Sequence, residues 1–163
     1  MAAGATYTPL STTTLGSAAA NVNFSSISGS YTDLIIIVYI NGFSSTAECG
    51  LQFNGDTGTN YSRTYMVGDS VSVRSARTSN ATNVTVSANT TNKEQFSAHI
   101  MNYSNATTYK TVLSRSDEGG SSTKATVGMW RNTNAITSIL IVPTSAVNFP
   151  VGSTFTLWGI FNA

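Results

Sequence analysis

Charged residues are scarce in this chain of 163 residues, because eight Lys and Arg and seven Asp and Glu make up only 9% of it. An ordinary soluble domain has about 25%. The net charge of +1 excludes the strongly basic surface with which proteins bind nucleic acid or anionic lipid. The shortage of Lys, Glu and Leu also excludes a helical bundle or coiled coil. We therefore expect no nucleic-acid partner and no membrane partner.

Cysteine and histidine occur once each, as Cys49 and His99. A single cysteine excludes an intramolecular disulfide and the disulfide-stapled class of small secreted domains. The two residues together fall short of the roughly four ligands of a structural zinc site. Lys and Arg are absent before Arg63, and no apolar h-region precedes it. We therefore expect no signal peptide and accumulation in the cytoplasm.

Small polar residues replace the missing charge, with 23 Ser, 25 Thr and 15 Asn beside a hydrophobic share of 40%. Short runs of alternating apolar residues are separated by clusters of Gly, Asn, Asp and Ser, which is typical of an all-β sandwich or barrel. No window of 11 or more residues carries a helical period. The predicted strands are 21–27, 31–41, 48–53, 61–67, 71–77, 82–88, 94–103, 109–114, 124–131, 136–142 and 154–161.

These patterns predict one antiparallel β-sandwich domain over residues 21–163, preceded by an extended N-terminal arm over residues 1–20. Residues 94–103 alternate, with Phe96, Ala98 and Ile100 on one face. By contrast, residues 34–40, 139–142 and 155–161 are apolar on both faces. A sandwich buries one face of each sheet, so the second faces of these strands need another cover. The N-terminal arm or a neighbouring subunit could provide it, and we favour a homo-oligomer.

Candidate catalytic and metal-binding residues are few. Any Ser-His-Asp or Cys-His arrangement would have to use His99, which shares its strand face with Gln95, Ser97 and Met101 and is expected on a surface or interface. Cys49 lies in an apolar-alternating strand and is expected to be buried and inert. Residues 54–60 superficially suggest a calcium loop, but they offer one carboxylate, so a tight turn is expected.

The remaining candidates are carboxylates and aromatics. A glycosidase needs two carboxylates across a cleft, and the sequence pairs none of Asp33, Glu48, Asp56, Asp69, Glu94, Asp117 and Glu118 in that way. Six aromatic rings could form a sugar-binding surface, or they could lie in the core and in subunit contacts. We favour the second interpretation. The six residues are Tyr61, Tyr65, Tyr103, Tyr109, Trp130 and Trp158. No nucleotide-binding glycine motif occurs. We therefore predict no enzyme, no catalytic or cofactor-binding residue, no metal ligand and no cofactor.

Three stretches resemble a family of small virion proteins of tailed bacteriophages: residues 23–34 (NFSSISGSYTDL), residues 51–62 (LQFNGDTGTNYS) and the ending from residue 136 to residue 160. Residues 68–95 carry no matching motif. The resemblance implies a jelly-roll-like fold and a non-enzymatic structural role. Relatives of this kind serve as capsid decoration (cement) proteins or as tail and fibre components, commonly as trimers. The resemblance provides no catalytic or binding residue to carry across.

The resulting hypothesis is a virion structural protein, assembled in the host cytoplasm, that decorates and stabilises the outer capsid as a homotrimer. Its expected partners are its own copies and the major capsid protein or tail proteins. The small size, without a coiled-coil or collagen-like shaft, favours decoration over a complete fibre. A tail-tip or fibre head that binds a host receptor or glycan is the alternative. A small hydrolase that depends on His99 is the third class of function considered.

Overall fold

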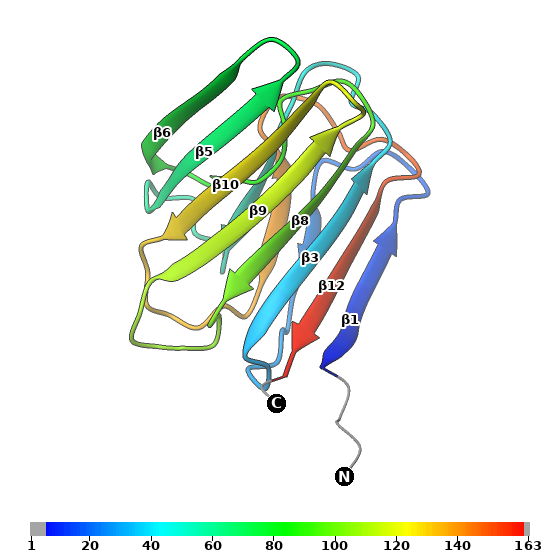
Figure 1. The fold of residues 1–163 in the computed structure, drawn as a ribbon. Helices are drawn as coiled ribbons and strands as arrows, with labels where there is room; N and C mark the ends of the chain where they lie inside the picture. Colours follow the sequence, from blue (N-terminus) through cyan, green and yellow to red (C-terminus); the bar gives the residue numbers. More distant parts are fainter. Residues whose placement is uncertain (1–5, 162–163) are drawn as a thin grey trace.

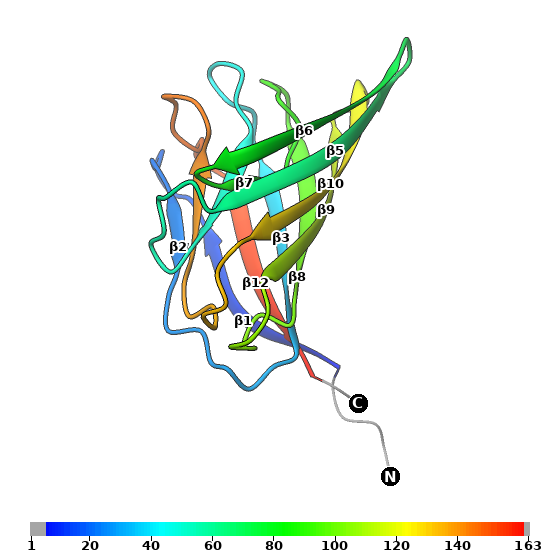
Figure 2. The same cartoon turned by 90° about the vertical axis from the view of Figure 1, so that its left-hand side faces the viewer.

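The computed structural model describes residues 6–161, and these residues form twelve β-strands and no helix. The predicted all-β antiparallel sandwich is confirmed: an eight-stranded sheet packs against a four-stranded sheet (Figures 1 and 2). The large sheet has the order β1-β12-β3-β8-β9-β10-β5-β6. Its strands are β1 (Tyr7–Thr14), β12 (Thr154–Ile160), β3 (Asp33–Ile40), β8 (Glu94–Met101), β9 (Lys110–Glu118), β10 (Ser122–Trp130), β5 (Tyr61–Asp69) and β6 (Val73–Ala81).

The small sheet has the order β2-β11-β4-β7. Its strands are β2 (Val22–Phe24), β11 (Ile139–Pro143), β4 (Cys49–Phe53) and β7 (Val84–Thr85). It covers one face of the large sheet, and residues 6–161 place no further layer on the opposite face (Figure 2). We call this opposite face the outer face.

Side-chain alternation places the core between the two sheets. In β8, Phe96, Ala98 and Ile100 point inward and are buried, as the sequence predicts. Leu34, Ile36, Val38 and Ile40 of β3 share this interior and are fully buried. An aromatic group closes one end, where Trp130 stacks on Tyr61 and both rings contact Phe53. The sandwich thus has one continuous hydrophobic core.

The N-terminal segment is part of the large sheet. Strand β1 pairs with β12 over Tyr7 to Thr14 and forms one edge of the sheet (Figure 1). Residues 7–14 of the predicted arm therefore make their ladder hydrogen bonds within their own chain rather than on a neighbour. Because β1 extends the sheet sideways, it does not cover the second face of β3. Residues 1–5 of the predicted arm lie outside the described residues.

Turn residues set the ends of several strands. The β9–β10 hairpin turns at Gly119 and Gly120, whose φ angles of 43° and 87° lie in the left-handed region that glycine adopts freely. Pro143 is the last residue of β11, which fits its inability to donate a ladder hydrogen bond. The Asn54 carboxamide accepts hydrogen bonds from the backbone N–H groups of Thr137 and Ser138, which joins β4 to the start of β11.

Candidate functional site

His99 lies on the outer face, where the structure gives it an acidic partner. Its Nε2 is 2.8 Å from Oδ2 of Asp33, while Oδ1 of Asp33 accepts the backbone N–H of Asn102 at 2.6 Å. Cys49, the thiol that a Cys-His pair would need, lies in the other sheet and is fully buried. Burial raises the pKa of this thiol well above its ordinary value, so Cys49 is held in its inert neutral form.

The loop that suggests calcium is closed on itself. Both carboxylate oxygens of Asp56 accept hydrogen bonds. Oδ1 accepts the Gly58 N–H at 2.9 Å, and Oδ2 accepts the Asn60 side chain at 3.0 Å and the Trp130 indole at 2.7 Å. Burial tends to raise the pKa of Asp56, but these donors outweigh it and leave the pKa lowered. Hydrogen-bond donors therefore occupy the carboxylate oxygens that a calcium ion would need as ligands.

The aromatic candidates divide between the core and the surface. Tyr61, Tyr103 and Trp130 are buried, Tyr109 is exposed, and Tyr65 and Trp158 are half-buried. Within residues 6–161, no three His, Cys, Asp or Glu side chains gather as a potential metal site. The same residues contain no helix that is long and apolar enough to span a membrane.

The outer face of the large sheet carries a band of exposed apolar side chains. In ladder register, Leu113 of β9 lies opposite Val127 of β10, and Ala125 of β10 lies opposite Met66 of β5. We define the outer-face band by six of the large exposed side chains on this face: Ile37, Met66, Met101, Leu113, Val127 and Met129. These side chains are 38–60% exposed. Exposed apolar side chains gathered on one face of a sheet mark interaction surfaces.

A hollow of about 780 Å³ opens beside the outer-face band and is lined in part by Ile37, Met66 and Val73. Two side chains of opposite charge, Arg115 and Asp117, also line it, and both project outward from β9. The Arg115 Nε donates to the Ser97 hydroxyl at 3.2 Å. The hollow thus combines apolar contact area with charged side chains of both signs.

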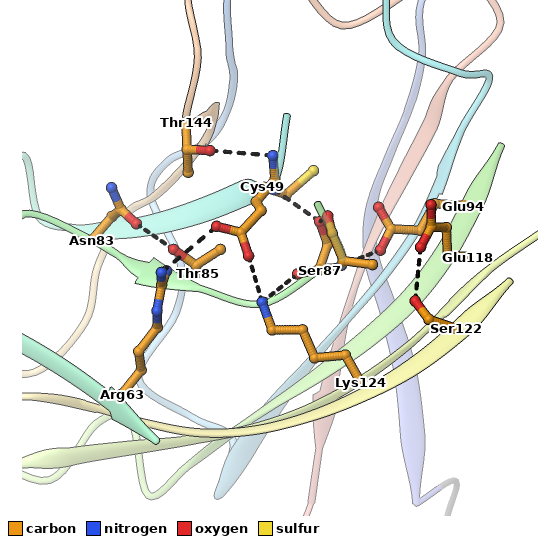
Figure 3. Close-up of polar contacts among 12 residues, drawn as sticks. Cys49, Arg63, Asn83, Thr85, Ser87, Glu94, Glu118, Ser122, Lys124 and Thr144 are labelled. Atoms are coloured by element: carbon orange, nitrogen blue, oxygen red, sulfur yellow. Dashed lines mark hydrogen bonds and ion pairs between the residues drawn. The ribbon is translucent and has the colours of Figure 1, made fainter. Parts of the chain in front are cut away.

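A polar cluster occupies the space between the sheets at the other side of β10. Lys124 and Arg63 extend from the large sheet toward the segments that carry Cys49 and Ser87 (Figure 3). The Lys124 ammonium donates to Oε1 of Glu48 at 2.5 Å and to the Ser87 carbonyl at 2.8 Å. The Arg63 guanidinium lies 3.6 Å from Oε2 of the same glutamate. Glu48 therefore lies between two cations, and Lys124 itself is only 3% exposed.

Glu94 is the second carboxylate of this cluster and is 1% exposed. Its Oε1 accepts the backbone N–H of Ala88 at 2.5 Å, whereas its Oε2 has no hydrogen-bond partner among the described residues. Burial, which penalises the charged form, raises the pKa of Glu94 from 4.5 to about 7. The carboxyl group is thus largely protonated below neutral pH.

This pKa predicts that the protein loses stability as the pH rises from 5 to 8. Between about 4.5 and 7 the unfolded chain has released the Glu94 proton while the folded chain retains it, so folding is favoured at the acidic end. The shift corresponds to about 3 kcal/mol of unfolding free energy, fully present below pH 4.5 and lost above pH 7. Urea unfolding at pH 5 and pH 8 measures the loss.

Glu94→Gln is the matched control, because it keeps the shape and the acceptor for the Ala88 N–H but has no carboxyl proton. The variant should keep nearly the same stability at both pH values and should exceed the wild type at pH 8. If the unfolding free energies of both proteins fall by the same amount between pH 5 and pH 8, the pH dependence does not come from Glu94.

Comparison of the sequence with protein-family models and with curated proteins finds no match.

Sequence reasoning left the carboxylates unpaired and did not identify the polar cluster. The alternation of side chains does carry a signal. Glu94 lies on the same side of its strand as Phe96 and Ala98, and Lys124 lies on the same side as Trp130. Alternation alone places such residues on the buried face. It cannot show that Glu48, the residue just before β4 of the other sheet, lies within reach of Lys124.

Proposed function

We propose that this chain is a capsid decoration (cement) protein of a tailed bacteriophage that binds the outer capsid surface as a homotrimer. The observation that carries the proposal is the outer-face band, an uncovered apolar surface on the larger sheet of the sandwich. Three copies that pack these bands around a threefold axis would bury the second faces of β3 and β10. Such a trimer presents three identical docking surfaces to the capsid.

Two features support this assignment. Low charge leaves few like-charged side chains to hold identical surfaces apart, which suits close packing of copies. The resemblance of residues 23–34 and 51–62 to small virion proteins supports the same class. Attachment at three points strengthens binding by avidity, so single contacts with the capsid can remain modest.

Binding to purified capsids tests the proposal. Capsids stripped of accessory proteins should take up the trimer until every equivalent position is filled, and bound capsids should resist thermal disruption better than bare ones. Quantitative mass spectrometry of virions should then give a copy number comparable to that of the major capsid protein. A handful of copies per particle, or saturable binding to host envelopes and none to capsids, would overturn the proposal in favour of a tail-tip or fibre-head protein.

A further inference from the structure

The polar cluster borders a cavity that none of the roles above uses. This cavity of about 260 Å³ is bounded by strands β5, β6 and β10 and by the segment that follows β7. We call it the Arg63 pocket. Its polar lining includes Arg63, Arg74, Lys124, Glu48 and Glu118, and the half-buried ring of Tyr65 adds an aromatic wall.

Most charges around the Arg63 pocket have partners. Lys124 donates to Glu48 at 2.5 Å, and Arg74 lies 3.3 Å from Asp69. Glu118 accepts a hydrogen bond from the Ser122 hydroxyl at 2.7 Å. Among the described residues that line the pocket, these contacts leave Arg63 as the cation without a hydrogen-bonded acceptor.

Arg63 is half-buried, and one of its hydrogen-bond donors is buried without an acceptor. Its side chain is 17% exposed, and its Nε has no hydrogen-bond partner among the described residues. The contact between Nη2 and Glu48 is 3.6 Å, which is too long for a hydrogen bond. A guanidinium group offers five N–H donors in a planar fork, and leaving one of them buried without an acceptor, as Nε is here, is costly. The pocket therefore lacks an acceptor that would pair with this fork.

We propose that the Arg63 pocket binds a carboxylate group. A carboxylate matches the guanidinium fork with two parallel hydrogen bonds. Glu48, already within 4 Å of both Arg63 and Lys124, adds negative charge nearby and so disfavours a doubly charged phosphate. The volume of the pocket suits a small carboxylic acid or one acidic side chain of a partner protein. Arg74, 61% exposed, is a second cation in the lining.

Acetate is the first probe, with NMR detection of the arginine Nε–H signals of the intact chain at constant ionic strength. The Arg63 signal should shift saturably with acetate and should not do so with chloride. The Arg77 signal is the internal control, since this side chain is exposed on β6 and does not line the pocket. Arg63→Lys keeps the charge but loses the fork, and it should weaken acetate binding about tenfold. Arg77→Lys should leave it unchanged.

A second probe, N-acetylglutamate methylamide, separates the two sources of the carboxylate. Tighter binding than acetate indicates an acidic side chain of a partner, and weaker binding indicates a free acid. Both results require Arg63 to respond. The proposal is overturned if Arg63 shows no saturable shift, if Arg63 and Arg77 respond alike, or if a crystal grown in acetate shows water only beside Arg63. Because the wild-type titration suffices, failure of Arg63→Lys to fold would not remove the test.

Discussion

Replacing Gly128 with alanine should lower the free energy of unfolding by about 3 kcal/mol, a large effect for the addition of one methyl group. Gly128 lies on the inner face of β10, where a Cβ atom would come within 2.1 Å of Cγ1 of Val84. Val84 belongs to β7 in the opposite sheet and is completely buried, so it has no free space to enter. The two sheets would have to separate locally. Denaturant unfolding followed by circular dichroism measures the loss.

Gly68→Ala is the matched control, because Gly68 lies in β5 of the same sheet and an added Cβ would meet nothing within 4 Å. Its effect should stay within about 0.5 kcal/mol. The double variant Gly128→Ala/Val84→Ala should cost less than the sum of the two single changes, since shortening Val84 makes room for the new methyl group. Strict additivity would mean that the close approach of β7 to β10 is wrong.

Replacing Val127 with aspartate should dissociate the proposed trimer while leaving the sandwich folded. Val127 is 55% exposed in the single chain and lies at the centre of the outer-face band, beside Leu113. An aspartate buried there in a subunit contact would lose its hydration without gaining a partner. We expect the dissociation constant to rise at least about a hundredfold, measured by sedimentation velocity across a concentration series.

Val71→Asp makes the same chemical change outside the outer-face band. Val71 is 91% exposed in the turn between β5 and β6, so this variant should remain trimeric. Circular dichroism should show the strand spectrum of the wild type for both variants. Equal dissociation of Val127→Asp and Val71→Asp would point to a general effect of charge and would contradict the placement of the contact on the outer face.

Local patterns predict most of the strands but not their distribution between the sheets. Each of the eleven predicted ranges contains or overlaps an observed strand, because alternation and turn residues act over a few neighbours. Strand β1 was the exception, predicted as an arm. Its polar run of Ser and Thr carries no apolar face, and its place in the sheet depends on pairing with β12, at least 140 residues away.

The candidate surfaces were predictable to different extents. The apolar second face of residues 34–40 indicated that β3 needs a second cover, and Ile37 and Tyr39 are indeed exposed on the outer face. The contributions of Met66 and Val127 to the same surface depend on the order of β10 and β5 in the sheet. The contact of Glu48 with Lys124 joins residues 76 positions apart, one just before β4 and one in β10, so no local pattern could predict it.

Light scattering of the wild-type chain tests the central claim, assembly through the outer face, most directly. At micromolar concentration we expect a single species with three times the chain mass of 17.1 kDa. Hydrogen exchange on the same sample should show the backbone amides of β10 around Val127 protected relative to Val127→Asp. A homogeneous monomer throughout this concentration range would contradict assembly through the outer face.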